Sequence, residues 1–288
     1  MDETDAAHVI KRTHFDNAKF VIEQIRELGL KPHPRSRLMQ MLRLLNCTYI
    51  PFHHPDFAIA LEAQRDLQFL GFVFDQIKAT RDNAKLKQLT RLALGDSVLP
   101  QHDKRESAGR DAQFELYLAA LCCKSGMMPV DFAEPDVTCA VGGKSFGIAV
   151  KRIKSKKQVL ARIKKAALQI EKAGYPGVIA LDLSLAWNPD NQPVVSRFHS
   201  EMYPRVSGLL GQQFFAKNMK DIAPLVVHKR VIAIVAFNSR IRLRPNNQWG
   251  LDVTMTWAET PCREQDVEDF DAFHAAFLGQ MPNVKRLE

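Results

Sequence analysis

The segment 134–152, EPDVTCAVGGKSFGIAVKR, contains the residues whose types and spacing suit catalysis. Asp136 follows a proline, and Lys151 lies near the end of the apolar run FGIAVK. Carboxylates bind a hard cation through oxygen, and such a cation polarises a phosphate and activates a water molecule. A neighbouring lysine orients that water or offsets developing negative charge. Together, Asp136 and Lys151 predict magnesium-assisted hydrolysis of a phosphodiester bond.

Two strands joined by a glycine turn are expected to bring these residues together. Residues 137–141 and 146–153 are largely apolar runs, and the Gly142-Gly143 pair between them is typical of a β-hairpin. Residues two apart on a strand point to the same face of a sheet. Lys151 and position 149 therefore share a face, and the hairpin brings that face close to Asp136.

Two predicted helices flank the hairpin and add polar side chains. The first begins at residue 111 with the sequence DAQFELYLAALCCKSG and carries Glu115. In the second, apolar residues recur at helical spacing between residues 160 and 170, and Gln169 projects beside this stripe. Glu115 can reach the Asp136 end of the hairpin, so it is a candidate metal ligand. Gln169 is better suited to a supporting role.

Positive charge is concentrated directly after the hairpin. The whole chain carries a net charge of +8, and no acidic residue occurs between Asp136 and Glu171. A solvated helix face explains the later lysines but not the complete lack of compensating acids, so we expect contacts with phosphate groups. The candidate nucleic-acid-binding residues are Lys144, Arg152, Lys154, Lys156, Lys157, Arg162 and Lys165.

The chain divides into a helical region, residues 1–99, a polar linker, 100–110, and a mixed region, 111–288. In the first region, apolar residues recur at helical spacing, and the third helix is expected to break at Gly71. In the mixed region the order helix, three strands, helix, strand predicts an α/β or α+β fold. A last helix is expected over about residues 264–278.

Further local signals lie within the mixed region. Ser155 and Gln158 form a capping-box pattern at the start of the helix after the hairpin. The run VIALDLSL, residues 178–185, and the run VIAIVAF, residues 231–237, are typical of buried central strands. The segments RIRLR and DVTMTW are expected to form separate later strands.

Over residues 111–184 the chain resembles the PD-(D/E)xK nuclease superfamily. The matching residues are Pro135-Asp136, Lys151, Glu115 on the leading helix and Gln169 on the following helix. Some members carry a tyrosine four residues after this glutamine, and here Tyr175 comes later instead. Each element alone is common, whereas their order, their spacing and the basic helix together make the resemblance fairly specific.

The resemblance implies a restriction-endonuclease-like core sheet flanked by helices, preceded by an all-helical N-terminal region. It implies a magnesium- or manganese-dependent endonuclease that acts on DNA in prokaryotic restriction, defence or repair. Asp136, Glu115 and the backbone carbonyl of Val150 would bind the metal, and Lys151 would position the water. The N-terminal helices would form a homodimer or bind a partner protein.

Ala149 departs from the superfamily pattern, which has Asp or Glu two residues before the lysine. An alanine cannot bind a cation, so this chain is expected to hold magnesium poorly and to cleave slowly or not at all. Three explanations are open: an introduced change from Glu or Asp, a natural loss that leaves a nucleic-acid-binding or protein-interaction subunit, and migration of the carboxylate to Glu134 or Asp182. The intact Asp136 and Lys151 favour the first.

Composition argues against several other classes of protein. The five cysteines show no CxxC spacing, which argues against a disulfide framework or a structural zinc site and favours a reducing cytoplasm. No apolar run reaches the length of a membrane span, and the first residues lack the apolar core of a signal peptide. His53-His54 has no partner at ligand spacing, so we expect a loop or helix start there.

Overall fold

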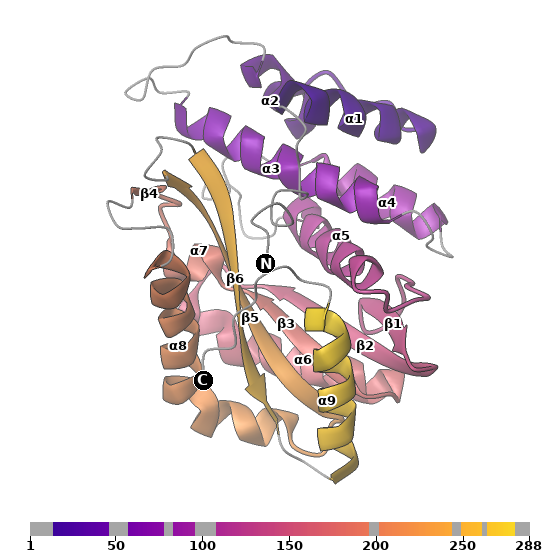
Figure 1. Cartoon of the computed structure of the whole chain (residues 1–288), viewed down its shortest axis with the longest axis vertical. Coiled ribbons are helices and arrows are strands. Elements are labelled where there is room, and N and C mark those ends of the chain that lie inside the picture. Colours follow the sequence, from indigo (N-terminus) through magenta and orange to yellow (C-terminus); the bar gives the residue numbers. More distant parts are fainter. Residues whose placement is uncertain are drawn as a thin grey trace, which may run out of the picture.

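Helices cover both faces of one mixed β-sheet, and a group of N-terminal helices lies at one end of it (Figure 1). The computed structural model describes residues 14–45, 57–77, 83–95, 108–195, 202–243, 249–260 and 264–279. Within these ranges no helix is both long and apolar enough to cross a membrane.

The sheet has six strands in the order β1-β2-β3-β5-β4, with β6 paired to β5. The hairpin strands β1 and β2 are antiparallel, as are β5 and β6, whereas β2, β3 and β5 run parallel. The carboxyl ends of these three parallel strands therefore meet at one edge of the sheet. The strands are Val137–Val141 (β1), Lys144–Arg152 (β2), Gly177–Asp182 (β3), Val194–Val195 (β4), Val231–Leu243 (β5) and Trp249–Glu259 (β6).

Alternation along the strands divides the core into two layers. Ile148 of β2 belongs to the layer beneath α5 and α9, whereas Ala149 belongs to the layer beneath α6 and α8. Val178 and Ile179 of β3 divide in the same way. The period of two residues thus buries both faces of the central strands. The covering helices are Ala108–Lys124 (α5), Val159–Ala173 (α6), Met202–Val226 (α8) and Glu264–Gly279 (α9), and α7 is the short helix Ser184–Trp187.

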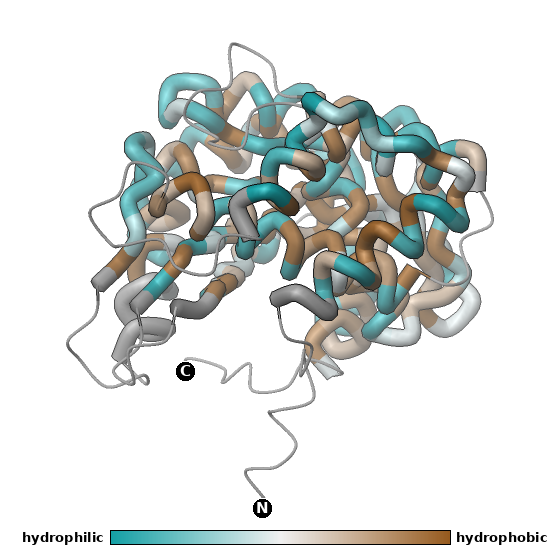
Figure 2. The backbone as a smooth tube through the Cα atoms, turned by 90° about the horizontal axis from the view of Figure 1, so that it is seen from above, coloured by the Kyte–Doolittle hydropathy of each residue, from teal (hydrophilic) through white to brown (hydrophobic). Residues whose placement is uncertain are grey.

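The N-terminal helices pack against one another and against α5. A separate apolar cluster joins α1, α2 and one side of α3 from Ala63 to Phe74, while Val73 of α3 and the buried residues of α4 share the larger core with α5. Apolar and polar residues alternate along these helices, as Figure 2 shows in brown and teal. The four helices are His14–Glu27 (α1), Arg37–Leu45 (α2), Phe57–Gln76 (α3) and Asn83–Ala93 (α4).

The predicted mixed sheet with flanking helices is confirmed, and so is the hairpin between residues 137 and 153. Gly142 and Gly143 form its turn with φ values of 56° and 81°, a region that favours glycine. The last helix begins at Glu264 and ends at Gly279, close to the predicted span.

Two local predictions are wrong. Helix α3 passes through Gly71 without a break. A Cβ at residue 71 would lie 2.6 Å from Oδ1 of Asn17, so this glycine lets α1 approach α3 rather than ending the helix. The side chain of Ser155 makes no capping hydrogen bond, because a 3-10 turn, Lys156–Gln158, precedes α6.

Other differences concern element boundaries. The segment RIRLR does not form its own strand, because its first residues continue β5. Helix α5 begins at Ala108, so residues 108–110 of the predicted linker are helical. Helix α8 has no counterpart in the sequence prediction. The rest of the predicted linker and His53-His54 lie outside the described residues.

Candidate active site

Asp136 lies at the centre of a small polar site at the start of β1. The hairpin register pairs Val137 with Ile148, which places Asp136 beside the end of β2. Its Oδ2 accepts a hydrogen bond from the backbone N–H of Val150 and another from the ammonium of Lys151, both at 2.7 Å. The carboxylate is therefore fixed by the strand that carries the lysine.

Lys151 is almost fully buried, with 8% of its surface exposed. Its ammonium also donates to the carbonyl of Val150 at 2.8 Å. A buried ammonium needs partners to offset its desolvation, and Asp136 supplies the opposite charge. This ion pair and the bond to the Val150 carbonyl hold the Lys151 side chain in one place.

Gln169 of α6 completes the support of Asp136. Its side-chain amide donates to the carbonyl of Pro135 at 2.7 Å and to Oδ1 of Asp136 at 3.3 Å. The other end of this side chain, Oε1, is buried and has no hydrogen-bond partner among the described residues. Gln169 thus connects the helix after the hairpin to the Pro-Asp turn.

Two residues that the sequence patterns did not place in the site shape the Pro-Asp turn. The hydroxyl of Tyr175 donates to the carbonyl of Glu134 at 2.5 Å. A Cβ on Gly147 would lie 2.7 Å from Cδ of Pro135 and 3.0 Å from the Tyr175 ring. The tyrosine is visible in the sequence, but only the turn that follows α6 brings it back to Glu134.

Glu115 faces the same site from α5. Burial raises the pKa of Glu115 to about 7, and the negative charge of Asp136 acts in the same direction, while Lys85 and Lys151 oppose the shift. These influences place the carboxyl within the field of the Asp136–Lys151 pair. A carboxyl that titrates near neutral pH can both accept and donate a proton under physiological conditions.

Ala149 is fully buried in the layer beneath α6. It shares an apolar cluster with Ala166 and Ala167 of that helix and with Ile179, its register partner on β3. A carboxylate at this position would be placed among these apolar side chains, where burial of its charge is costly.

Neither of the two acids considered as replacements for a carboxylate at position 149 joins the Asp136 contacts. Asp182 accepts hydrogen bonds from the N–H and hydroxyl of Ser184 at 3.0 and 2.6 Å, and its carboxylate lies 3.4 Å from Arg152. Glu134 is exposed, and it accepts the Tyr175 hydrogen bond through its backbone carbonyl. Among the described residues, Asp136 forms the ion pair with Lys151, and the charge of Lys151 also acts on the carboxyl of Glu115.

This donor set suits a magnesium or manganese ion that binds few protein ligands. Across the described ranges, no group of three or more His, Cys, Asp or Glu side chains is placed to hold a metal. Magnesium is often bound through one or two carboxylates together with substrate phosphates. Asp136, Glu115 and the Val150 carbonyl supply such a reduced set. The residues therefore fit a weakly held cation that takes its remaining ligands from substrate and water.

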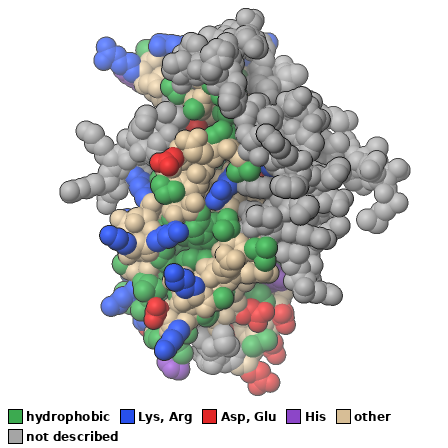
Figure 3. Space-filling view, turned by 90° about the vertical axis from the view of Figure 1, so that its left-hand side faces the viewer, with side chains coloured by type: hydrophobic (Ala, Val, Ile, Leu, Met, Phe, Trp, Pro, Cys, Tyr) green, Lys and Arg blue, Asp and Glu red, His purple; other side chains and the backbone are tan. Residues whose placement is uncertain are grey.

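The predicted nucleic-acid-binding residues divide into two groups. Lys156, Lys157 and Lys165 are exposed, and Lys154 and Arg162 are half-buried, all on the segment from β2 to α6. Lys144 forms an ion pair with Asp269 of α9, and Arg152 is buried against Asp182. The first group is therefore better placed for phosphate contacts than the second. Figure 3 shows Lys and Arg side chains spread over the described part of one face of the molecule, with apolar patches between them.

Comparison with family models, curated proteins and solved structures gives no match to this chain.

Proposed function

We propose that this chain is a metal-dependent nuclease of the PD-(D/E)xK type whose site has lost one carboxylate. The observation that carries the proposal is the set of contacts made by Asp136. One of its oxygens binds the Lys151 ammonium and the Val150 N–H, and the other accepts from Gln169. A carboxylate held in this way between a hairpin lysine and a helix glutamine is what the resemblance in the sequence leads us to expect.

The order of elements around the site supports the same proposal. Helix α5 is followed by a single β-bridge between Asp131 and Thr138, the β1–β2 hairpin, helix α6 and then β3 parallel to β2. The sequence predicts three strands between the two helices, and the first of these is reduced to this single bridge, while the rest of the order agrees with the prediction. Asp136, Lys151 and Gln169 come from three successive parts of the chain that meet at one place, and the charges of Asp136 and Lys151 act on Glu115 of α5.

Each of these residues has a chemical role in the proposed reaction. A magnesium or manganese ion, when bound, would polarise the scissile phosphate and lower the pKa of a water molecule. Lys151, held in place by Asp136, would orient the water and offset negative charge that develops on the phosphate. Glu115 would supply a second carboxylate to the ion beside Asp136.

A nucleic-acid-binding protein without cleavage is the second candidate, and the packing of Ala149 favours it. Ala149 is fully buried among alanine and isoleucine side chains, so it fits its surroundings as an ordinary core residue. The exposed Lys156, Lys157 and Lys165 would still contact phosphates, and binding would weaken steeply with added salt.

Cleavage assays on plasmid and single-stranded DNA with magnesium or manganese test the proposal. The protein should be compared with Ala149→Glu and with Ala149→Gln, since glutamine has almost the shape of glutamate but no charge. We expect the glutamate variant to cleave and the glutamine variant to match the unmodified protein. If neither variant cleaves, yet all three proteins bind DNA with steep salt dependence, the binding-protein candidate is correct.

A further inference from the structure

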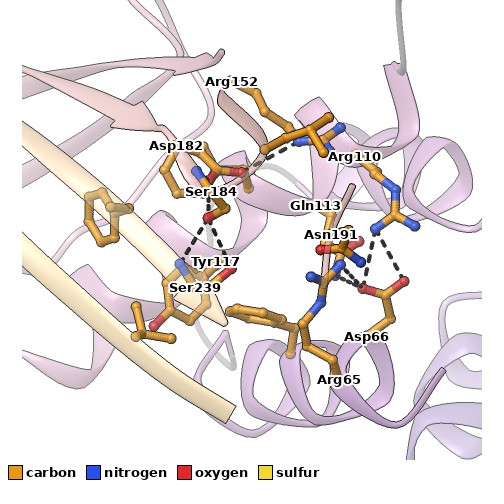
Figure 4. Close-up of a pocket in the computed structure, with 15 residues that line it drawn as sticks. Arg65, Asp66, Arg110, Gln113, Tyr117, Arg152, Asp182, Ser184, Asn191 and Ser239 are labelled. Carbon is orange, nitrogen blue, oxygen red and sulfur yellow. Dashed lines mark hydrogen bonds and ion pairs between the residues drawn. The ribbon is translucent and has the colours of Figure 1, made fainter. Parts of the chain in front are cut away.

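A second polar site lies where the carboxyl ends of β2 and β3 and the middle of β5 meet helices α3 and α5 (Figure 4). It is a recess of about 60 Å³. Asp182, Ser184 and Ser239 line it from the strand side, while Arg65 and Arg110 line it from the helices. The lining includes none of the residues that contact Asp136, so the recess is a separate site.

Guanidinium groups dominate the charge around the recess. Arg65, Arg110 and Arg152 line it with side chains that are 8%, 4% and 6% exposed. Asp66 lies 3.5 Å from Arg65 and 3.4 Å from Arg110, and Asp182 lies 3.4 Å from Arg152. The lining thus holds three guanidinium groups and two carboxylates.

The lining therefore carries more positive than negative charge, and the charged residues behind it do not cancel this difference. Glu62 forms an ion pair with Arg65, and Arg37 lies 3.7 Å from Asp66, which adds one charge of each sign. Burial raises the pKa of Glu62, which favours its neutral form and increases the positive excess. Asp111 also influences Arg152, but it is exposed to solvent, where its charge is screened.

The guanidinium groups of the lining repel one another. Burial lowers the pKa of Arg152, and the nearby charges of Arg110 and Arg65 act in the same direction, whereas Asp182 opposes the shift. An anion in the recess would relieve the repulsion among these groups.

The recess has room for a phosphate group, because about 60 Å³ is several times the space that one water molecule needs. The hydroxyls of Ser184 and Ser239, 3.2 Å apart, lie across the recess from Arg65 and Arg110 and offer further polar contacts.

We propose that this recess binds a phosphate monoester, with Arg65 and Arg110 as its main ligands. Guanidinium groups suit phosphate because their planar N–H forks match its oxygens. The phosphate can come from the end of a nucleic-acid strand or from a free phosphate or mononucleotide. The strand-end source rests on the proposed function.

Isothermal titration of the full chain in EDTA tests the proposal without cleavage. The first probe is inorganic phosphate at matched ionic strength with chloride as the reference salt. The second is one oligonucleotide prepared with a 5′-phosphate, with a 3′-phosphate and with hydroxyls at both ends. We expect saturable binding of inorganic phosphate and at least tenfold tighter binding of one phosphate-ended strand. Absence of saturable phosphate binding, together with equal affinity for all three strands, would overturn the proposal.

The remaining outcome separates the two sources of phosphate. If inorganic phosphate binds but a terminal phosphate adds nothing to strand affinity, the recess takes a free phosphate compound and the strand-end source is wrong. Because the titration contains no metal and measures no cleavage, it is independent of the Ala149→Glu assay. If the protein binds phosphate but neither it nor Ala149→Glu cleaves DNA, the phosphate site is supported and the nuclease proposal is wrong.

Substitutions in the lining test whether the phosphate binds in the recess. Arg65→Lys keeps a positive charge beside Glu62 and Asp66 but removes the planar guanidinium fork, and we expect at least tenfold weaker phosphate binding. Ser239→Ala is a milder change that should weaken phosphate binding severalfold, and it is the variant to use if Arg65→Lys does not fold. Lys172→Gln, an exposed change on α6, is the control and should leave inorganic phosphate affinity unchanged. Equal phosphate affinity in Ser239→Ala and in a folded Arg65→Lys variant would place the anion elsewhere.

Discussion

Lys151 donates a hydrogen bond to Asp136 at 2.7 Å from the adjacent strand of the same hairpin, and only 8% of the lysine is exposed. In the Ala149→Glu background, we expect Lys151→Met to lower cleavage by about 10²–10³-fold, which is typical of removing one group that stabilises transition-state charge. Single-turnover cleavage with saturating metal measures this effect. Lys172→Met, an exposed change on α6, is the control. Unchanged cleavage in Lys151→Met would remove the lysine from the mechanism.

Glu115 makes the stability of the protein depend on pH. Its pKa is raised to about 7 in the folded protein from 4.5, so between these values the folded state holds a proton that the unfolded state has lost. The contribution of this group to stability is therefore greatest below about pH 4.5. It falls as the pH rises through 7, by about 3 kcal/mol at most.

Urea unfolding of the protein and of Glu115→Gln, compared at pH 5 and pH 8, tests this prediction. The glutamine variant should lose this part of the pH dependence and be more stable than the unmodified protein at pH 8. An identical pH profile in both proteins would show that Glu115 titrates normally.

Gly147 should not tolerate a larger side chain. A Cβ there would lie 2.7 Å from Cδ of Pro135 and 3.0 Å from the ring of Tyr175, and neither ring can move away freely. We expect Gly147→Ala to destabilise the fold by about 1–3 kcal/mol, as overpacking usually does. Thermal or urea unfolding measures this change in stability. Ser145→Ala, exposed on the same strand, should change stability little.

The exposed lysines of the β2–α6 segment should determine how nucleic-acid binding depends on salt. Replacing Lys156, Lys157 or Lys165 with Gln should reduce the slope of log K against log salt by about 0.7–0.9 for each phosphate that is no longer neutralised. Lys31→Gln, on the loop between α1 and α2, is the control. Equal slopes in the lysine variants and the control would place the nucleic acid on another surface.

The hairpin and its flanking helices could be predicted because their signals are local. Glycine at the turn and a period of two residues along β2 are enough to put Lys151 on the face that Asp136 approaches. Helix α6 follows from its apolar spacing alone. These short-range patterns explain why the sequence alone identifies the residues that surround Asp136.

Helix α8 and the recess depend on contacts between distant segments. The α8 sequence contains Gly208, Gly211 and Pro224, which suggest a break, yet a Cβ at Gly211 would lie 2.0 Å from Oγ1 of Thr256. This glycine therefore allows the helix to lie against β6. Asp66 and Arg110 meet across 44 residues of sequence, and no local pattern identifies such a pair.

The core that α3 and α4 share with α5 affects where the chain can be shortened. Asp66 of α3 forms an ion pair with Arg110 and accepts a hydrogen bond from Gln113, both on α5. A fragment that begins at residue 111 would leave the buried apolar side of α5 without its cover and would also remove Asp66. Such a fragment should aggregate or fail to fold, so a catalytic core for separate expression has to retain the N-terminal helices.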